Sequence, residues 1–375
     1  MKEIMVTAIL ITIVGVFIIG LYLYFGKERP AGDSDAISAS PNFDPERGKF
    51  VNKRQDEIDE FLKNQSMLGM LIDFFRENDG PRKPPRKLPE VKPVFADFLA
   101  KDGRARFLWF GHSTILVNLG GKLILTDPLF AKGMSVLNPR FQDMVVPLEA
   151  LPDIDYILLT HDHYDHLHKD TLRFFKDKDT VFLTPLGVGA YLTEWGIGKD
   201  RIHEFDWWGT IRRDGITFTC TPSLHFSGRG LPYGNGTLWG SWAIRNATAN
   251  IYFSGDTGYG EHFQEIGDRL GPFDMAFLDV GQYHEKWKYA HMFPRQAPKA
   301  LRELRGKHLV PIHWGGFSLA NHSWYEPIEE VYKYSQQENT ELVAPKIGQI
   351  VEIGGEYNLE TWWRSLMEPQ PRKDL

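Results

Sequence analysis

The stretch LLTHDHYDHLH, residues 158–168, holds four histidines and two aspartates within eight positions, directly behind an apolar run. Titratable side chains this close repel one another when they carry like charge. Neutral imidazole nitrogen and carboxylate oxygen are ligands that borderline divalent metals such as zinc accept. A bound cation would convert the repulsive cluster into a coordinated one. The stretch therefore predicts a metal site.

More residues of metal-binding type stand where predicted strands end. His225 follows TFTCTPS by two residues, Asp256 closes IYFSGD, and His313 closes LVPIH. Loops at strand ends present side chains from a rigid sheet, which suits a site of fixed geometry. The candidate ligands number seven: His161, His163, Asp165, His166, His225, Asp256 and His313. Seven ligands are too many for one tetrahedral ion and fit two ions that share one carboxylate.

The alternative for these seven residues is a set of polar loop residues without a common partner. Two nearby residues also allow two interpretations. Asp127, which ends KLILTD, either orients a ligand histidine or is a simple turn carboxylate. His112, in GHST, is more typical of a buried structural histidine near the site than of a ligand.

Composition narrows the class of protein. The 375-residue chain has 42% hydrophobic and 25% charged residues, which is typical of a globular protein. Its net charge of −6 argues against general binding of nucleic acid, which needs a basic face. Its one cysteine, Cys220, excludes an intrachain disulfide and a multi-cysteine metal site. Any metal must therefore be held by histidine or carboxylate.

The N-terminus predicts a membrane anchor. Residues 4–25 contain no charged side chain and, as a helix, would cross a hydrocarbon core of about 30 Å. A cleaved signal peptide is the alternative, but its apolar region is normally shorter and ends at small residues. We therefore expect residues 1–25 to form a single-pass transmembrane anchor. The lysines and arginines beside it discriminate poorly between orientations, and we expect the catalytic domain on the cytoplasmic side.

Three further segments complete the predicted organisation. Residues 26–94 are expected to form a polar tether, an amphipathic helix over 50–76 and a basic, proline-rich linker. The helix either packs on the main domain or lies on the bilayer surface. A catalytic domain is expected over 95–355 and a C-terminal tail over 356–375.

The predicted domain alternates short β-rich segments with helices, which indicates two sheets covered by helices. A strand is expected at residues 107–111, followed by a hairpin over 115–128 that turns on Gly120 and Gly121. Further strands are expected at residues 155–161, 180–185, 216–223, 237–245, 250–257, 273–280 and 308–316. Helices are expected at residues 187–196, 261–270, 294–305 and 325–338.

The motif HDHYDH, followed by histidine, aspartate and histidine in that order, resembles the signature of the metallo-β-lactamase fold superfamily. A closer resemblance is to N-acylphosphatidylethanolamine-hydrolysing phospholipase D and its bacterial relatives. It is carried by WFGHSTILV, LTDPLF, LPDIDYILLTHDHYDHL, EFDWW, TPSLHFSGR, LWGSWAI, FSGDTGY, IGDRLGPFD and IHWGGFSLAN. These segments span roughly residues 95–350. The resemblance implies an αββα sandwich and two Zn²⁺ ions per chain.

The resemblance also implies individual roles. One zinc would be held by His161, His163 and His225, and the other by Asp165, His166 and His313, with Asp256 bridging them. Asp165 would also receive the proton of the attacking water. His291, in YAHMFP, matches a histidine at the substrate phosphate, although a helix-capping residue is the alternative. Apart from the resemblance, tryptophans mostly belong to the core, and the alternative for Trp287 and Trp324 is that they line an acyl-chain groove. The stretch QYHEKWKYA (282–290) does not closely follow the sequence of the mammalian enzyme of this family, so the resemblance leaves the lipid preference open.

The sequence therefore predicts a membrane-anchored dizinc hydrolase that cleaves a phospholipid phosphodiester. Its expected reaction converts N-acylphosphatidylethanolamine to N-acylethanolamine and phosphatidic acid. Two alternatives remain: a metal-dependent lactonase or other ester hydrolase of the same fold, and a non-catalytic membrane scaffold with structural metals. The expected partners are the phospholipid substrate and a bilayer contacted through residues 4–25, without nucleic acid. The sequence leaves a homodimer open.

Overall fold

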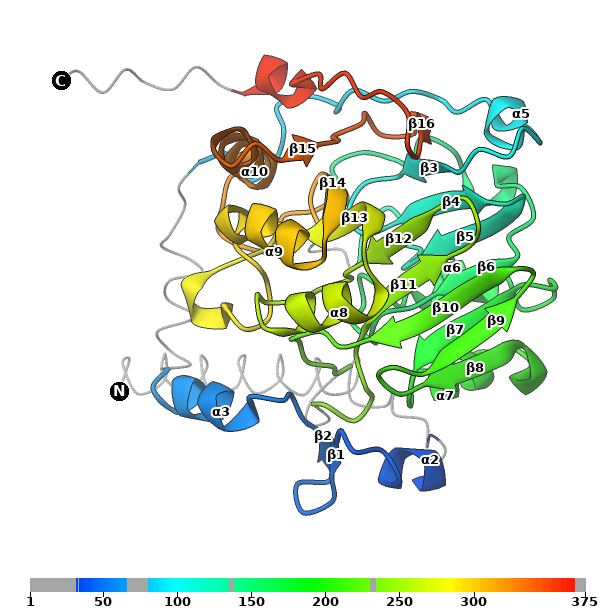
Figure 1. The fold of residues 1–375 in the computed structure, drawn as a ribbon, viewed down its shortest axis with the longest axis vertical. Helices are drawn as coiled ribbons and strands as arrows, with labels where there is room; N and C mark the ends of the chain where they lie inside the picture. The colour runs from blue at the N-terminus through cyan, green and yellow to red at the C-terminus, as the bar shows by residue number, and fades with distance from the viewer. Residues whose placement is uncertain (1–31, 33, 66–79, 135–137, 230–233, 368–375) are drawn as a thin grey trace, which may run out of the picture.

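The architecture is a sandwich of two seven-stranded sheets whose outer faces carry helices (Figure 1). It is seen in a computed structural model that describes residues 32, 34–65, 80–134, 138–229 and 234–367. The first sheet has, in spatial order, strands β16 (Val351–Glu352), β3 (Arg106–Trp109), β4 (Ile115–Leu119), β5 (Lys122–Thr126), β6 (Tyr156–Leu158), β7 (Val181–Pro185) and β8 (Ile202–Phe205). The second has β15 (Glu341–Leu342), β14 (Gly306–Ile312), β13 (Phe273–Asp279), β12 (Asn250–Phe253), β11 (Ser241–Arg245), β10 (Ile216–Thr221) and β9 (Thr210–Arg213). The predicted αββα sandwich is confirmed.

Helices cover both sheets. On the first sheet these are α6 (Lys169–Arg173) and α7 (Gly189–Glu194), with the short α5 (Phe95–Phe98) before β3; on the second they are α8 (His262–Leu270), α9 (Ala297–Glu303) and α10 (Glu326–Gln337). The four predicted helices correspond to α7, α8, α9 and α10. The turn η4 (Pro294–Gln296) precedes α9, so the helix expected over 294–305 begins as a 3₁₀ turn.

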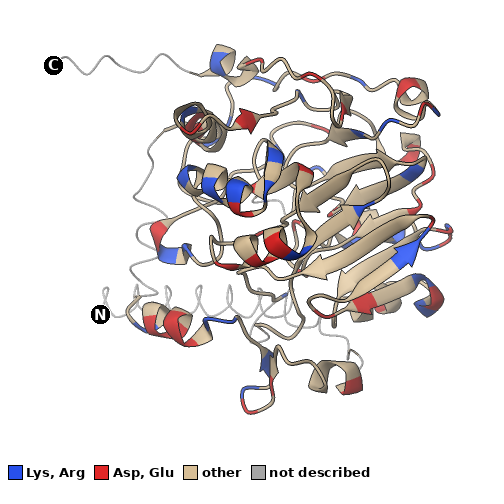
Figure 2. Ribbon diagram, in the orientation of Figure 1, with Lys and Arg blue, Asp and Glu red and all other residues tan. Residues whose placement is uncertain are grey.

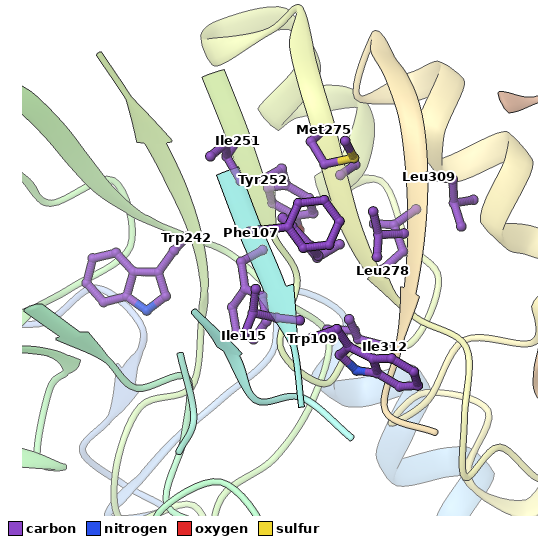
Figure 3. Packing of buried hydrophobic residues seen from close by; sticks show 14 of the residues in the cluster. Phe107, Trp109, Ile115, Trp242, Ile251, Tyr252, Met275, Leu278, Leu309 and Ile312 are labelled. Carbon is purple, nitrogen blue, oxygen red and sulfur yellow. The ribbon is translucent and has the colours of Figure 1, made fainter. Parts of the chain in front are cut away.

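Alternating side chains explain why the first sheet is buried on both faces. Phe107 and Trp109 point between the sheets, whereas Leu108 and Phe110 belong to a second core under the helices. Across the sandwich, the rings of Phe107 and Phe277 meet edge to face with centroids 4.9 Å apart. Figure 3 shows this inter-sheet core, with β3 side chains directed at those of β12, β13 and β14.

Strand direction brings the loops of both sheets to one edge. Strands β5, β6 and β7 pair in parallel, and so do β12, β13 and β14. Because parallel strands end at the same edge, the loops after them share one side of the sandwich. Strand β10 is antiparallel to β11, which is antiparallel to β12, so β10 also ends at this edge. The metal-binding residue types follow these strands.

One strand is shorter than expected for an identifiable reason. The strand predicted over 237–245 begins only at Ser241. The preceding amides donate elsewhere: Leu238 N to Leu186 O at 2.8 Å and Gly240 N to Thr160 O at 2.9 Å. These bonds join the segment to loops of the first sheet rather than to a neighbouring strand.

The N-terminal part packs on the body over most of its described length. It contains α2 (Ser34–Ser38), β1 (Phe43–Asp44), β2 (Lys49–Phe50) and α3 (Gln55–Lys63), so the polar tether expected over 26–48 instead contains a helix and a strand pair. The helix expected over 50–76 begins at Gln55, because the amide of the buried Phe50 donates to Asn235 O at 2.9 Å. Residues 66–79 lie outside the described part.

The predicted transmembrane span and the predicted C-terminal tail lie at the two ends of the chain. The span expected over residues 4–25 lies outside the described residues, and among those described no helix has the length and apolarity to cross a bilayer. The tail expected from 356 holds η5 (Trp362–Leu366), whose Trp362 and Trp363 are buried in the inter-sheet core.

Candidate metal centre

The loops after the buried strands bring all seven predicted ligands together. His161, His163, Asp165 and His166 follow β6, His225 follows β10, Asp256 follows β12, and His313 follows β14. A loop of the second sheet lies in close contact with a loop of the first sheet at this edge. Gly255, with φ +56°, lies so near Thr160 that a Cβ atom would be 2.5 Å from its side chain. This position therefore requires glycine.

The first cluster contains His161, His163, His225 and Asp256. His163 Nδ1 lies 2.8 Å from His161 Nε2 and 3.3 Å from His225 Nε2. Asp256 Oδ2 lies 3.8 Å from Nε2 of both His161 and His225. One ligand atom from each of the four residues thus falls within 4.8 Å of every other.

The second cluster contains Asp165, His166 and His313, joined by His112. Asp165 Oδ2 lies 2.9 Å from His112 Nε2, 3.3 Å from His166 Nε2 and 3.5 Å from His313 Nε2. Asp256 Oδ2 lies 3.1 Å from His166 Nε2 and 3.2 Å from His313 Nε2. The same Asp256 oxygen therefore faces both clusters, as a bridging carboxylate would.

Hydrogen bonds behind the clusters hold three histidines in one tautomer. His166 Nδ1 donates to Asp127 Oδ2 at 2.8 Å, and His225 Nδ1 donates to Ala290 O at 2.8 Å. The Thr160 hydroxyl donates to Asp127 at 2.7 Å, so it must accept from His161 Nδ1 at 2.9 Å. Each ring therefore keeps its Nε2 lone pair for the cluster, the arrangement typical of metal-ligating histidine.

Electrostatics in the absence of a cation explain how the cluster stays together. Burial alone would lower the pKa of His166, but Asp256 and Asp165 raise it well above its usual range. The pKa of His313 is likewise raised, to about 10, because Asp256 and Asp279 outweigh its burial. Burial and the neighbouring histidines hold the pKa of His161 well below its usual range.

The two carboxylates show the complementary effect. Burial alone would raise the pKa of Asp165 and Asp256, but the neighbouring histidines lower both well below the usual range. The electrostatics thus favour negative carboxylates that face positive charge. Divalent cations would supply that positive charge directly.

The donor set fits metal ions. His166 Nε2 and Asp256 Oδ1 are buried without a hydrogen-bond partner, although both face the cluster. Buried polar atoms are rarely left unpaired unless an unseen group satisfies them. The two clusters each combine three histidines with one carboxylate, counting His112 in the second, and each could hold an ion. The ligand role of each residue stays a prediction.

The other sequence candidates take distinct positions. Asp127 is fully buried and holds His166, which is the orienting arrangement rather than a simple turn. His112 contacts Asp165 directly, so it lies closer to the cluster than the sequence indicated. His291 stacks on His313 with ring centroids 5.0 Å apart and meets the His225 ring at 5.2 Å.

Sequence reasoning missed one residue of the site, Asp279. It is fully buried at the end of β13. Its Oδ2 accepts from His291 Nδ1 at 3.0 Å, and its Oδ1 lies 3.2 Å from His313 Nδ1. The available signal was its position, since it closes the apolar segment FDMAFLD as Asp127 follows KLILT.

An apolar groove of about 710 Å³ opens beside His225. One wall comes from β2 and α3, and the other from the loops around residues 226 and 287. Its apolar lining includes Phe50, Ile58, Phe61, Leu62, Phe226 and Trp287. Trp287 thus lies where the sequence suggested, whereas Trp324 is buried elsewhere and does not line the groove.

Phe226 joins the groove to the metal centre. Its ring lies 4.6 Å from that of His163 and 4.8 Å from that of His225, centroid to centroid. It is 45% exposed, an unusual position for a large apolar side chain. A ligand in the groove would therefore meet Phe226 next to two candidate metal ligands.

Comparison with known proteins agrees with the site. Residues 122–314 match the family model of the beta-lactamase superfamily domain. An uncharacterized protein of Mycobacterium tuberculosis is 38% identical over 87% of this chain and 88% of its own length. N-acyl-phosphatidylethanolamine-hydrolyzing phospholipase D 1 of Caenorhabditis elegans is 32% identical over 70% of this chain and 80% of its own length.

A solved structure gives the same fold. The structure of a possible metal-dependent hydrolase from Veillonella parvula superposes with a TM-score of 0.54. It is 15% identical and covers 66% of this chain and 99% of that one. With two seven-stranded sheets, clusters of histidine and aspartate at one edge, and these relatives, the chain belongs to the metallo-β-lactamase superfamily, close to N-acylphosphatidylethanolamine-hydrolysing phospholipase D, and is a metal-dependent hydrolase of that fold.

Proposed function

We propose that the protein is a dizinc phosphodiesterase that cleaves a phospholipid on the headgroup side of its phosphate. The proposed substrate is N-acylphosphatidylethanolamine, and the products are N-acylethanolamine and phosphatidic acid. The relative from C. elegans carries the name of this activity. The apolar groove that ends at His225 and Phe226 is the observation that carries the proposal.

The groove favours a lipid over a small polar ester. Its walls present aliphatic and aromatic side chains, and burying an acyl methylene against them contributes about 0.8 kcal/mol. Its inner end lies at His225, so a chain in the groove would place the polar part of the lipid at the two clusters. A lactone that lacks a long chain would leave this surface uncovered.

The chemistry assigns a task to each polar group. Zinc, when bound, would polarise the phosphoryl oxygens and make water a stronger nucleophile. Asp165, the more exposed of the two cluster carboxylates, would accept the proton of the attacking water. The water oxygen joins phosphorus, the bond from phosphorus to the ethanolamine oxygen breaks, and that oxygen takes up a proton. His291, whose side chain is 13% exposed, would contact the phosphate.

Residues 4–25 would anchor this site to the bilayer. Their 22 positions hold no charged residue, and residues of the N-terminal part from Arg47 onward line the groove. Because diacyl phospholipids rarely leave the bilayer, an anchored enzyme meets its substrate without waiting for it to dissociate. We propose that the catalytic domain lies on the cytoplasmic side.

A lipid panel tests the substrate. The purified full-length protein, loaded with zinc, is incubated in mixed micelles with N-acylphosphatidylethanolamine, phosphatidylcholine or a long-chain homoserine lactone, and products are identified by mass spectrometry. Release of N-acylethanolamine is expected, and lactone opening without phosphodiester cleavage would refute the proposal. Elemental analysis of the same sample gives the metal and its stoichiometry.

Two variants control that assay. Asp256→Ala removes the carboxylate oxygen that faces both clusters, so we expect activity to fall at least 10³-fold on the scale of lost metal catalysis. Asp268→Ala removes an exposed carboxylate on α8 and should leave activity unchanged. Bound zinc without turnover on any ester would instead favour the membrane scaffold.

A further inference from the structure

Asp279 touches two histidines with different tasks. Its Oδ2 accepts a hydrogen bond from His291 Nδ1 at 3.0 Å, and its Oδ1 lies 3.2 Å from Nδ1 of the candidate ligand His313. The two rings stack nearly parallel, 16° apart, with centroids 5.0 Å from each other. One carboxylate therefore faces the same nitrogen of both rings.

Backbone amides hold this carboxylate in place. Thr257 N donates to Oδ2 and Gly281 N donates to Oδ1, each at 3.2 Å. Asp279 N is itself bound to Ser254 Oγ at 2.9 Å. Gly281 lies so close to His313 O that a Cβ atom would be 1.8 Å away, so the loop after β13 and the loop after β14 cannot separate without loss of this contact. The carboxylate is thus rigid as well as buried.

The orientation of both rings follows from that carboxylate. With Nδ1 of His313 turned to Asp279, its Nε2 faces Asp165 and Asp256, where a metal ion would sit. With Nδ1 of His291 bound to Asp279, its Nε2 is left for a substrate oxygen. The ring of His291 lies between His313 and His225, one from each cluster.

We infer that Asp279 is a positioning residue that orients a metal-ligating histidine and the substrate-facing His291 at once. Asp256, Asp279, His291 and His313 also have ligand atoms within 4.8 Å of one another. A third ion there is not needed, because Asp279 Oδ2 already accepts from His291 Nδ1 and Thr257 N, while its Oδ1 accepts from Gly281 N and lies 3.2 Å from His313 Nδ1. The inference rests on the proposed phosphodiester hydrolysis only for the substrate contact of His291.

Asp279→Asn is the discriminating variant because it keeps the shape and removes one acceptor. An amide offers one oxygen and one NH₂, so it cannot accept from both imidazoles. Whichever histidine faces the NH₂ must present a bare Nδ1 and carry its proton on Nε2. If that ring is His313 it cannot ligate through Nε2, and if it is His291 its contact with substrate changes.

The experiment measures metal and turnover separately. Wild type, Asp279→Asn, His291→Ala and the double variant are stripped with chelator and reloaded with Zn²⁺ or Co²⁺. We expect Asp279→Asn to bind one of two ions 10- to 100-fold more weakly, the usual effect of losing a carboxylate behind a ligand histidine, and to change the Co²⁺ visible spectrum. Asp274→Asn, a carboxylate on the same strand that binds Lys307 and Asn250 N, should match wild type.

Turnover at saturating Zn²⁺ isolates the effect through His291. With a soluble phosphodiester such as bis(p-nitrophenyl) phosphate, Asp279→Asn should lower kcat, and the double variant should be no slower than His291→Ala alone. The inference would be overturned if the losses in kcat caused by Asp279→Asn and His291→Ala multiplied in the double variant while Asp279→Asn left the metal affinity and the Co²⁺ spectrum unchanged. If no protein turns over any phosphodiester, the proposed function fails while the metal and spectral results still decide the role of Asp279.

A measurement on wild type covers the case in which Asp279→Asn does not fold. Nitrogen-15 NMR of the imidazoles should show His291 and His313 with the proton on Nδ1. A bare Nδ1 on His291, with the proton on Nε2, would contradict the inference without any variant.

Discussion

Truncation of Phe61 should weaken catalysis on long-chain lipids and leave the metal chemistry intact. Phe61 is half-buried on α3, where its ring meets Tyr289 edge to face at 5.3 Å and Lys288 lies 4.6 Å from its centroid. The rest of the ring lines the groove. An acyl chain in the groove would cover that remaining surface.

The magnitude follows from the area that the lipid covers. Complete burial of a phenylalanine side chain contributes about 2 kcal/mol. Phe61 is of intermediate exposure, so at most about a third of its surface is left to bury. Phe61→Ala should therefore lose at most about 0.7 kcal/mol of lipid binding, which is about a threefold loss in kcat/KM. Each methylene added to the acyl chain should also gain less in the variant than in wild type.

The assay compares kcat/KM for N-acylphosphatidylethanolamines of increasing acyl length with that for bis(p-nitrophenyl) phosphate, which has no chain to bind. Phe174→Ala is the matched control: Phe174 is also half-buried, meets Phe175 edge to face and has Lys178 4.7 Å from its centroid, but it lines a different cavity. Equal losses on lipid and soluble substrate, or no loss on long chains, would refute the groove as the acyl site.

Two further variants test the support of the metal centre and the buried histidines. Asp127→Asn should weaken metal binding 10- to 100-fold in a chelator competition. The reason is that the asparagine amide cannot accept hydrogen bonds from His166, the Thr160 hydroxyl and the Thr160 amide together. Unchanged metal affinity would contradict the role given to Asp127. Burial and Lys53 lower the pKa of His262 to about 3 in the folded protein. Between about pH 6.5 and pH 3 the histidine is therefore protonated in the unfolded chain but neutral in the folded one, so the free energy of unfolding decreases as the pH is lowered. Urea unfolding of metal-free protein at pH 7 and about pH 4.5 should show wild type losing roughly 2–3 kcal/mol more than His262→Gln, and equal losses would show that His262 titrates normally.

Most of the candidate metal ligands could be predicted from local sequence patterns. His225, Asp256 and His313 could be chosen from the sequence because each follows an apolar segment that ends at the same edge of its sheet. Parallel pairing brings Asp256 and His313 to that edge, and two successive antiparallel pairings bring the end of β10, and with it His225, to the same edge.

The groove could not be predicted in the same way. Its walls come from residues 47–62 and from residues between 225 and 290, which touch only after the fold has formed. The contact of Asn52 Nδ2 with His225 O, 2.9 Å across 173 positions, has no local signal in the sequence. Residues 26–94 are predicted to form a tether, an amphipathic helix and a proline-rich linker, and nothing in that pattern says that they form one wall of the groove.

Asp127 and Asp279 support the metal centre in the same way, one from each sheet. Each carboxylate is fully buried at the end of a strand that has a parallel neighbour, and each faces the Nδ1 of a histidine whose Nε2 turns to Asp256. Asp127 reaches His166 from the first sheet, and Asp279 reaches His313 from the second. Because each anchor belongs to a different sheet, the geometry at Asp256 depends on how the two sheets pack. A core substitution between them, far from any ligand, should therefore disturb both metal positions together.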